Sequence, residues 1–146
     1  MEPQIIHREA FTVLGLEECF PDGQEDFEGI WKRYMRYHAQ IEPHSIDGAH
    51  YGVCFAHGEF GVLVYLAGMW VTEVGEVPEG LTQRTVPASR YAVFTCTVPT
   101  IGETYDRIFG EWLKSADVVR PAVGSPKADF EQYGDPVLIH IALEDA

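Results

Sequence analysis

The residues best suited to chemistry in this sequence are Asp129-Phe130-Glu131-Gln132-Tyr133, which set a carboxylate between two aromatic side chains. In an extended strand successive side chains point to opposite faces, so Asp129, Glu131 and Tyr133 share one face. If that face points inward, Glu131 is a buried acid beside a tyrosine, which is costly unless a cation or hydrogen-bond donors meet it. If it points outward, Glu131 is an ordinary solvated charge.

The remaining reactive side chains form no recognisable motif. Four histidines lie six or seven positions apart, at His38, His44, His50 and His57. This spacing does not match known zinc motifs. The three cysteines form no close pair, which favours buried thiols over a disulfide framework or a metal site. Because the sequence also lacks a P-loop, a Gly-x-Gly-x-x-Gly and a Gly-x-Ser-x-Gly, we expect no metal and no cofactor.

Composition predicts one domain, spanning residues 1–146, with a full hydrophobic core. Ten Lys and Arg against 23 Asp and Glu give a net charge of −13. The electrostatic field of this charge repels phosphate backbones and attracts cations. Direct nucleic-acid binding is therefore disfavoured, and a cationic small molecule or a basic protein surface is a better partner. No run of about 20 apolar residues and no signal peptide is visible, so we expect a cytoplasmic protein without membrane contact.

Two amphipathic helices are predicted among short strands. Apolar residues recur at helical spacing over residues 27–38 and again over 105–112. The β-branched and aromatic runs that predict strands cover residues 4–16, 51–55, 60–68, 91–97, 129–133 and 136–143. The turn of the first hairpin is assigned to His57-Gly58-Glu59, its second strand can extend to Val71, and Gly68 within it indicates a bulge or a close approach by another group.

The order of these elements is strand, helix, strand, strand, and then the same order again. We therefore expect an α+β fold in which two βαββ halves pair around a pseudo-twofold axis. Antiparallel sheets with two helices would then leave a central ligand cleft between the halves, and such a junction is a common ligand site.

The sequence resembles the GyrI-like proteins, also called effector-binding domains of AraC-type and multidrug-binding regulators. Matching segments are spread over most of the chain. They are residues 10–16, Ile30-Trp31, Tyr51-Gly52-Val53, 65–68, 77–81, Val86-Pro87-Ala88, 91–94, Thr104-Tyr105, Glu111-Trp112-Leu113 and 129–133. After Leu113 the sequence departs from the family pattern, because Lys114-Ser115-Ala116 stands where a proline and a Ser-Gly-aromatic turn are usual.

The resemblance implies a duplicated βαββ fold with an aromatic-lined pocket in which a buried glutamate neutralises lipophilic cations. On the matching motif that glutamate is Glu131, and Tyr133 lies on the same strand face. By position, the aromatic wall is assigned to Tyr51, Trp70, Phe94 and Trp112. The resemblance begins near Phe11, so the expectation is a stand-alone effector domain of a multidrug-binding type.

Three functions remain open at this point. The first is a binding module for lipophilic cationic or aromatic compounds. The second, also implied by the resemblance, is a hydrolase of cyclopropanoid electrophiles in which Glu131 is the general base and Tyr133 polarises the substrate. The third is a protein-interaction inhibitor of the gyrase-inhibitor type, with an acidic surface facing a basic protein partner.

Overall fold

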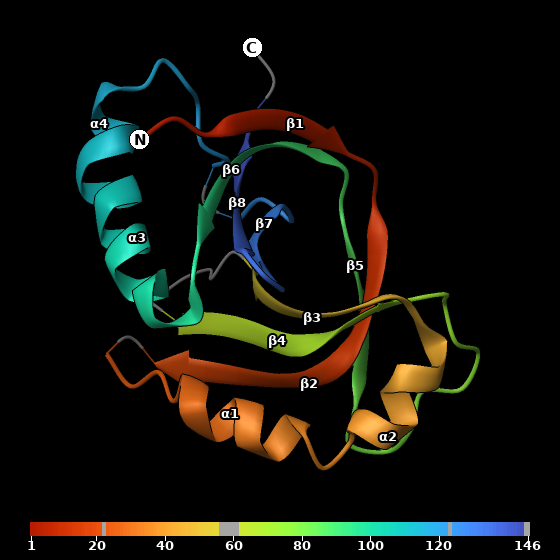
Figure 1. The fold of residues 1–146 in the computed structure, drawn as a ribbon. Helices are drawn as coiled ribbons and strands as arrows, with labels where there is room; N and C mark the ends of the chain where they lie inside the picture. The colour runs from red at the N-terminus through yellow and green to blue at the C-terminus, as the bar shows by residue number, and fades with distance from the viewer. Residues whose placement is uncertain (22, 56–61, 123, 145–146) are drawn as a thin grey trace.

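The computed structural model describes residues 1–21, 23–55, 62–122 and 124–144 (Figure 1). Its strands form one antiparallel sheet in the order β1-β6-β8-β7-β3-β4-β2-β5. The strands are β1 (Gln4–Arg8), β2 (Phe11–Pro21), β3 (Ser45–Phe55), β4 (Val62–Val71), β5 (Thr82–Val86), β6 (Ser89–Cys96), β7 (Ala128–Tyr133) and β8 (Val137–Leu143). The fold is therefore α+β, as the sequence predicts.

The helical segments lie outside the curled sheet (Figure 1). They are α1 (Phe27–Tyr34), α2 (His38–Ile41), α3 (Ile101–Arg107) and α4 (Leu113–Ser115), with short 3-10 turns at Glu42–His44 and Val98–Thr100. A π-helical segment, Ile108–Trp112, joins α3 to α4. None of the helices in the described part of the chain is long and apolar enough to span a membrane.

Side-chain alternation along the strands divides the hydrophobic core between the two faces of the sheet. The inner, concave face buries Val13, Val53 and Phe130 in one cluster. On the outer face, Leu14 packs in a cluster with α1 and α2, while Ile139 packs in another with the α3 region. Because strand residues alternate faces, Glu131, next to Phe130, belongs to the outer face.

Helix α1 begins where the sequence predicts a helix but ends at Tyr34, before the predicted end at residue 38. The side chain of Asp26 caps the helix by accepting a hydrogen bond from the Gly29 amide at 3.0 Å. Ile30 and Tyr34 are fully buried against the sheet. Phe27, one turn before Ile30, stays 42% exposed, so this face of α1 is not wholly used for packing.

Several strand boundaries differ from the prediction. The run expected at 4–16 is two strands, because β1 pairs with β6 whereas β2 pairs with β4 and β5. The segment from Glu17, which lies outside the runs predicted as strands, continues β2 to Pro21 as it pairs with β4. Strand β5 pairs with β2 through a polar sequence that carries no strong strand signal. The extension of β4 to Val71 is confirmed, and the turn at His57-Gly58-Glu59 lies outside the described residues.

The close approach predicted at Gly68 is confirmed. Gly68 pairs directly with Gly15 across β2 and β4. A Cβ atom on Gly15 would lie 2.0 Å from the Ala67 carbonyl oxygen, and one on Gly68 would lie 2.4 Å from the Leu14 carbonyl oxygen. The two glycines let these backbones approach closely, and larger residues would force them apart.

We expect Gly15→Ala to destabilise the fold by about 1–3 kcal/mol, because the added methyl group meets backbone atoms that cannot rotate away. Urea unfolding followed by far-UV circular dichroism measures this change. Gly75→Ala is the control, since a Cβ at Gly75 meets nothing within 4 Å. Equal stability of the two variants would contradict the proposed role of the close approach.

Candidate functional site

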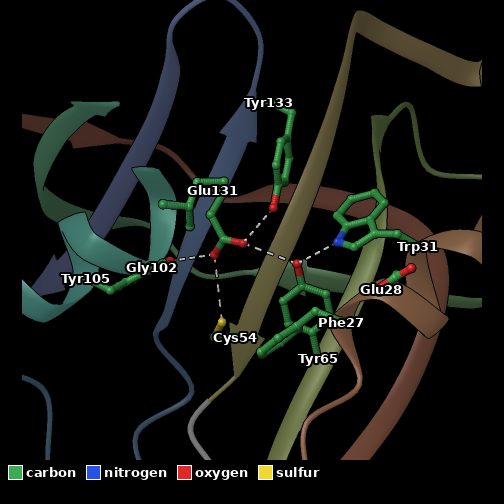
Figure 2. Close-up of a pocket in the computed structure, with 10 residues that line it drawn as sticks. Phe27, Glu28, Trp31, Cys54, Tyr65, Gly102, Tyr105, Glu131 and Tyr133 are labelled. Carbon is green, nitrogen blue, oxygen red and sulfur yellow. Dashed lines mark hydrogen bonds between the residues drawn. The ribbon is translucent and has the colours of Figure 1, made fainter. Parts of the chain in front are cut away.

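A cavity of about 480 Å³ opens on the outer face of the sheet between α1 and α3. Its size falls within the usual range for small-molecule pockets. Figure 2 shows its lining, which comes from α1, α3 and strands β3, β4 and β7. The lining residues are Phe27, Glu28, Trp31, Cys54, Tyr65, Ile101, Gly102, Tyr105, Glu131 and Tyr133.

Glu131 lies at the base of this cavity and is only 5% exposed. Three tyrosine hydroxyls donate to its carboxylate (Figure 2). Tyr105 donates to Oε2 at 2.5 Å, while Tyr65 and Tyr133 each donate to Oε1 at 3.2 Å. The Cys54 thiol adds a long contact to Oε2 at 4.0 Å. The acid is thus buried and well hydrogen-bonded.

All of these donors are electrically neutral. Burial raises the pKa of Glu131 above its ordinary value, and the hydrogen bonds from Tyr105, Tyr133 and Tyr65 oppose the shift. Among the described residues, no Lys, Arg or His forms an ion pair with Glu131. When ionised, the carboxylate therefore holds a negative charge that the protein itself does not neutralise.

Aromatic rings form the walls above the carboxylate. The Trp31 ring meets Tyr133 edge to face, with 5.1 Å between the ring centroids, and the Phe27 ring meets Tyr65 at 5.0 Å. The indole Nε1 of Trp31 donates to the Tyr65 hydroxyl at 3.2 Å. Because that hydroxyl in turn donates to Glu131, Trp31 orients a tyrosine that holds the acid.

Gly52 provides the space in which Tyr65 and Glu131 meet. It lies on β3, directly opposite Glu131 in the β3–β7 register. A Cβ atom at Gly52 would lie 2.0 Å from the Tyr65 hydroxyl and 2.9 Å from Oε1 of Glu131. The glycine is thus part of the site, although it offers no functional group.

The structure brings two of the predicted site residues, Glu131 and Tyr133, together in the cavity. The other four lie elsewhere. Tyr51 and Trp70 pack in the inner-face cluster, where both rings face the guanidinium of Arg8. Phe94 and Trp112 pack against each other beside the α3 region, with ring centroids 5.0 Å apart. A role in ligand binding for these four stays a prediction.

Sequence reasoning missed several residues that contact the carboxylate or wall the cavity. From the sequence, the helical spacing of Trp31 is typical of a core residue, and Tyr65, Tyr105 and Cys54 carry no functional assignment. One signal was available for Trp31, because Phe27 and Trp31 are four apart and lie beside, not on, the Ile30–Tyr34 core stripe. For Tyr65 and Tyr105 the sequence holds no such signal, since their placement depends on strand register and on how α3 docks.

Among the described residues, no group of three or more His, Cys, Asp or Glu side chains is placed to hold a metal ion. The arrangement of the cavity instead suits an organic ligand. One buried charge and several aromatic faces favour a cation with apolar substituents.

Comparison with known families matches residues 4–143 to Cass2, described as an integron-associated effector binding protein. The transcriptional regulator BrlR of Pseudomonas aeruginosa is 34% identical over 142 residues. The match covers 91% of this chain but 48% of BrlR, so the chain spans about half the length of that curated relative.

Known structures share the fold at low sequence identity. SAV2435, solved bound to tetraphenylphosphonium, superposes with a TM-score of 0.80 at 17% identity, covering 99% of this chain and 94% of SAV2435. The integron cassette protein VCH_CASS2 from the mobile metagenome of Vibrio cholerae gives a TM-score of 0.71 at 16% identity, covering 99% and 97%. The EcmrR C-terminal domain gives 0.68 at 12% identity, covering 99% and 98%.

The raised pKa of Glu131 predicts a specific pH dependence of stability. Between the ordinary carboxyl value of 4.5 and the raised value, the folded protein binds more protons than the unfolded chain. Stability should therefore fall as pH rises through this window. Urea unfolding of the wild type and Glu131→Gln, at intervals from pH 4.5 to 8, isolates this contribution as the difference between the two curves.

We expect the wild type to lose stability relative to Glu131→Gln as pH rises. Glutamine keeps the size of the side chain but carries no titrating proton, so the two variants share every other titration. A difference that stays constant across the range, or grows in favour of the wild type, would contradict the desolvated state of Glu131.

Proposed function

The chain belongs to the family of integron-associated effector-binding proteins, and we propose that it binds lipophilic cations and cationic aromatic compounds in the Glu131 cavity. The observation that carries this proposal is the buried carboxylate, which receives hydrogen bonds from three neutral tyrosines and forms no ion pair with any residue that the structure describes. A cationic ligand would supply the charge that the cavity lacks.

The energetics favour a delocalised cation with apolar substituents. A small hydrated ion would have to lose its hydration shell, whereas a lipophilic cation loses little on entering. Each good contact of the cation with an aromatic face contributes roughly 0.5–2 kcal/mol. Burial of apolar ligand surface adds about 25 cal/mol per Å² and tolerates varied shapes. These contributions suit a cavity that accepts chemically diverse ligands.

Two further observations support a cationic ligand. The net charge of −13 creates a field that attracts cations toward the protein. SAV2435, which shares the fold, was solved with tetraphenylphosphonium bound. Tetraphenylphosphonium is therefore a natural first probe for this protein.

The strand order supports a duplicated architecture, which we also propose. If β1, β2, β3 and β4 are exchanged with β5, β6, β7 and β8 respectively, the order β1-β6-β8-β7-β3-β4-β2-β5 becomes its own reverse. This is the pattern expected of two halves related by a pseudo-twofold axis between β3 and β7. The cavity lies on these two central strands, between α1 of the first half and α3 of the second.

The similarity to half of a transcriptional regulator suggests what ligand binding is for. We propose that this domain senses the ligand and that a protein partner responds to whether the ligand is bound. A ligand that contacts both α1 and α3 can alter how the two helices sit on the sheet, and a partner that binds either helix would respond.

We expect tetraphenylphosphonium to bind the protein and tetraphenylborate to bind at least about tenfold more weakly. The two ions have nearly the same shape and opposite charge, so the comparison isolates the electrostatic contribution. Isothermal titration calorimetry measures both affinities. Glu131→Gln should weaken tetraphenylphosphonium binding by about tenfold or more, because the countercharge is lost.

Glu76→Gln is the matched control, since Glu76 is exposed, lies outside the cavity and carries the same charge. It should bind as the wild type does. Equal affinity for the two ions would show that charge does not contribute to binding. Equal losses of affinity in the two variants would show that general attraction to an acidic protein accounts for the binding. Either result would overturn the role of Glu131.

A further inference from the structure

A second cavity, of about 320 Å³, adjoins the Glu131 cavity. It is lined by Trp31, Met35, His50, Val98, Ile101 and Tyr133. Trp31, Ile101 and Tyr133 also line the first cavity, so the two form neighbouring lobes along one groove between α1 and the start of α3. We call the lobe that contains Glu131 the head lobe, and the one lined by Met35, His50 and Val98 the tail lobe.

The tail lobe differs from the head lobe in its charge. No carboxylate lines it within the described residues. Its one titratable group besides Tyr133 is His50, whose Nδ1 lies 2.8 Å from the Tyr34 hydroxyl. Burial and the neighbouring His38 lower the pKa of His50, while Glu42, which pairs with His38 at 3.2 Å, acts in the opposite direction. Near neutral pH the lobe is therefore uncharged.

The walls of the tail lobe are apolar and partly exposed. Met35 is 55% exposed at the end of α1, and Val98 is 63% exposed at the turn before α3. Exposed apolar side chains that line a groove commonly mark a binding surface. Methionine is flexible and polarisable, so Met35 can adapt to aliphatic chains of different length.

We propose that the two lobes together bind elongated amphipathic monocations, with the cationic head beside Glu131 and an aliphatic tail passing Tyr133 into the tail lobe. This assignment rests on the proposed function of the head lobe and adds the class of ligand that it takes. Tyr133 borders both lobes and its hydroxyl donates to Glu131, so the ligand would bend around this side chain.

The proposal also predicts which cations the groove rejects. A linear dication with a charge at each end would place one charge at Glu131 and the other in the tail lobe. There the second charge meets no carboxylate among the described lining residues and must lose part of its hydration, and the more distant field of Glu42 and of the net charge of −13 offsets this cost only in part. A methyl group at the same place gains by burial instead. Chain length being equal, the monocation should bind more tightly.

Alkyltrimethylammonium ions with butyl, hexyl, octyl and decyl tails test the tail lobe, with affinity measured by calorimetry. The head group is constant, so affinity should rise about two- to fourfold per methylene while the tail enters the lobe. Decamethonium, which carries a second trimethylammonium group on a ten-carbon chain, should bind at least about fivefold more weakly than decyltrimethylammonium. Decamethonium binding equal to or tighter than the monocation would overturn the proposal.

A double variant, Met35→Ser with Val98→Ser, tests the location of the tail. Both side chains are exposed, so the fold should persist. The increase in affinity from butyltrimethylammonium to decyltrimethylammonium should become about tenfold smaller, while the affinity for butyltrimethylammonium changes less than about twofold. Val119→Ser is the control, because Val119 is 61% exposed and lines neither lobe. An unchanged chain-length dependence in the double variant would overturn the assignment of the tail lobe.

The same titrations separate this proposal from the one on which it rests. If Glu131→Gln leaves the affinity for butyltrimethylammonium and tetraphenylphosphonium unchanged, the role of the head lobe fails. If Glu131→Gln weakens the binding of both ligands but the double variant keeps the full dependence of affinity on chain length, the role of the head lobe is supported and only the assignment of the tail lobe fails.

Discussion

The site depends on one constraint, which is that a carboxylate must stay buried without a cationic partner. Three tyrosine hydroxyls meet this constraint by donating to Glu131, and they come from β4, α3 and β7. Each donor stabilises the ionised acid without neutralising it, so the negative charge is retained. An arginine in place of one of these tyrosines would form a buried ion pair with Glu131, so a cationic ligand would find no unpaired negative charge there.

The sheet topology makes this arrangement possible. Pairing of β3 with β7 sets Gly52 opposite Glu131 at the centre of the sheet, and Tyr65 from β4 reaches over the glycine. On the opposite face Phe130 fills the interior of the curl, stacked on His140 with 4.1 Å between the ring centroids. The helices pack on either side of this centre, so the groove runs between α1 and α3, where β3 and β7 meet.

The sequence predicts the parts of this arrangement that are local. Alternation along β7 places Glu131 and Tyr133 on one face, and helical periodicity predicts the helix that begins at Phe27 and an apolar face that includes Ile30 and Tyr34. It does not give strand register, which is fixed by contacts between distant segments. The position of Tyr65 beside Glu131 depends on the pairing of β4 with β3. Tyr51 and Trp70 are aromatic, and their positions in the sequence assigned them to the wall of the pocket. Alternation along their strands instead puts both on the inner face of the sheet, opposite Glu131.

If the cavity binds lipophilic cations as proposed, the same constraint would make it selective for charge and tolerant of shape. Selectivity would come from a fixed carboxylate whose desolvation cost a bound cation would relieve, and this cost is part of the folded protein before any ligand arrives. Tolerance of shape would come from Trp31, Tyr133 and Phe27. Their edge-to-face contacts leave ring faces that can pack against apolar groups of many shapes. A cation too bulky to touch the carboxylate would still lie within its field.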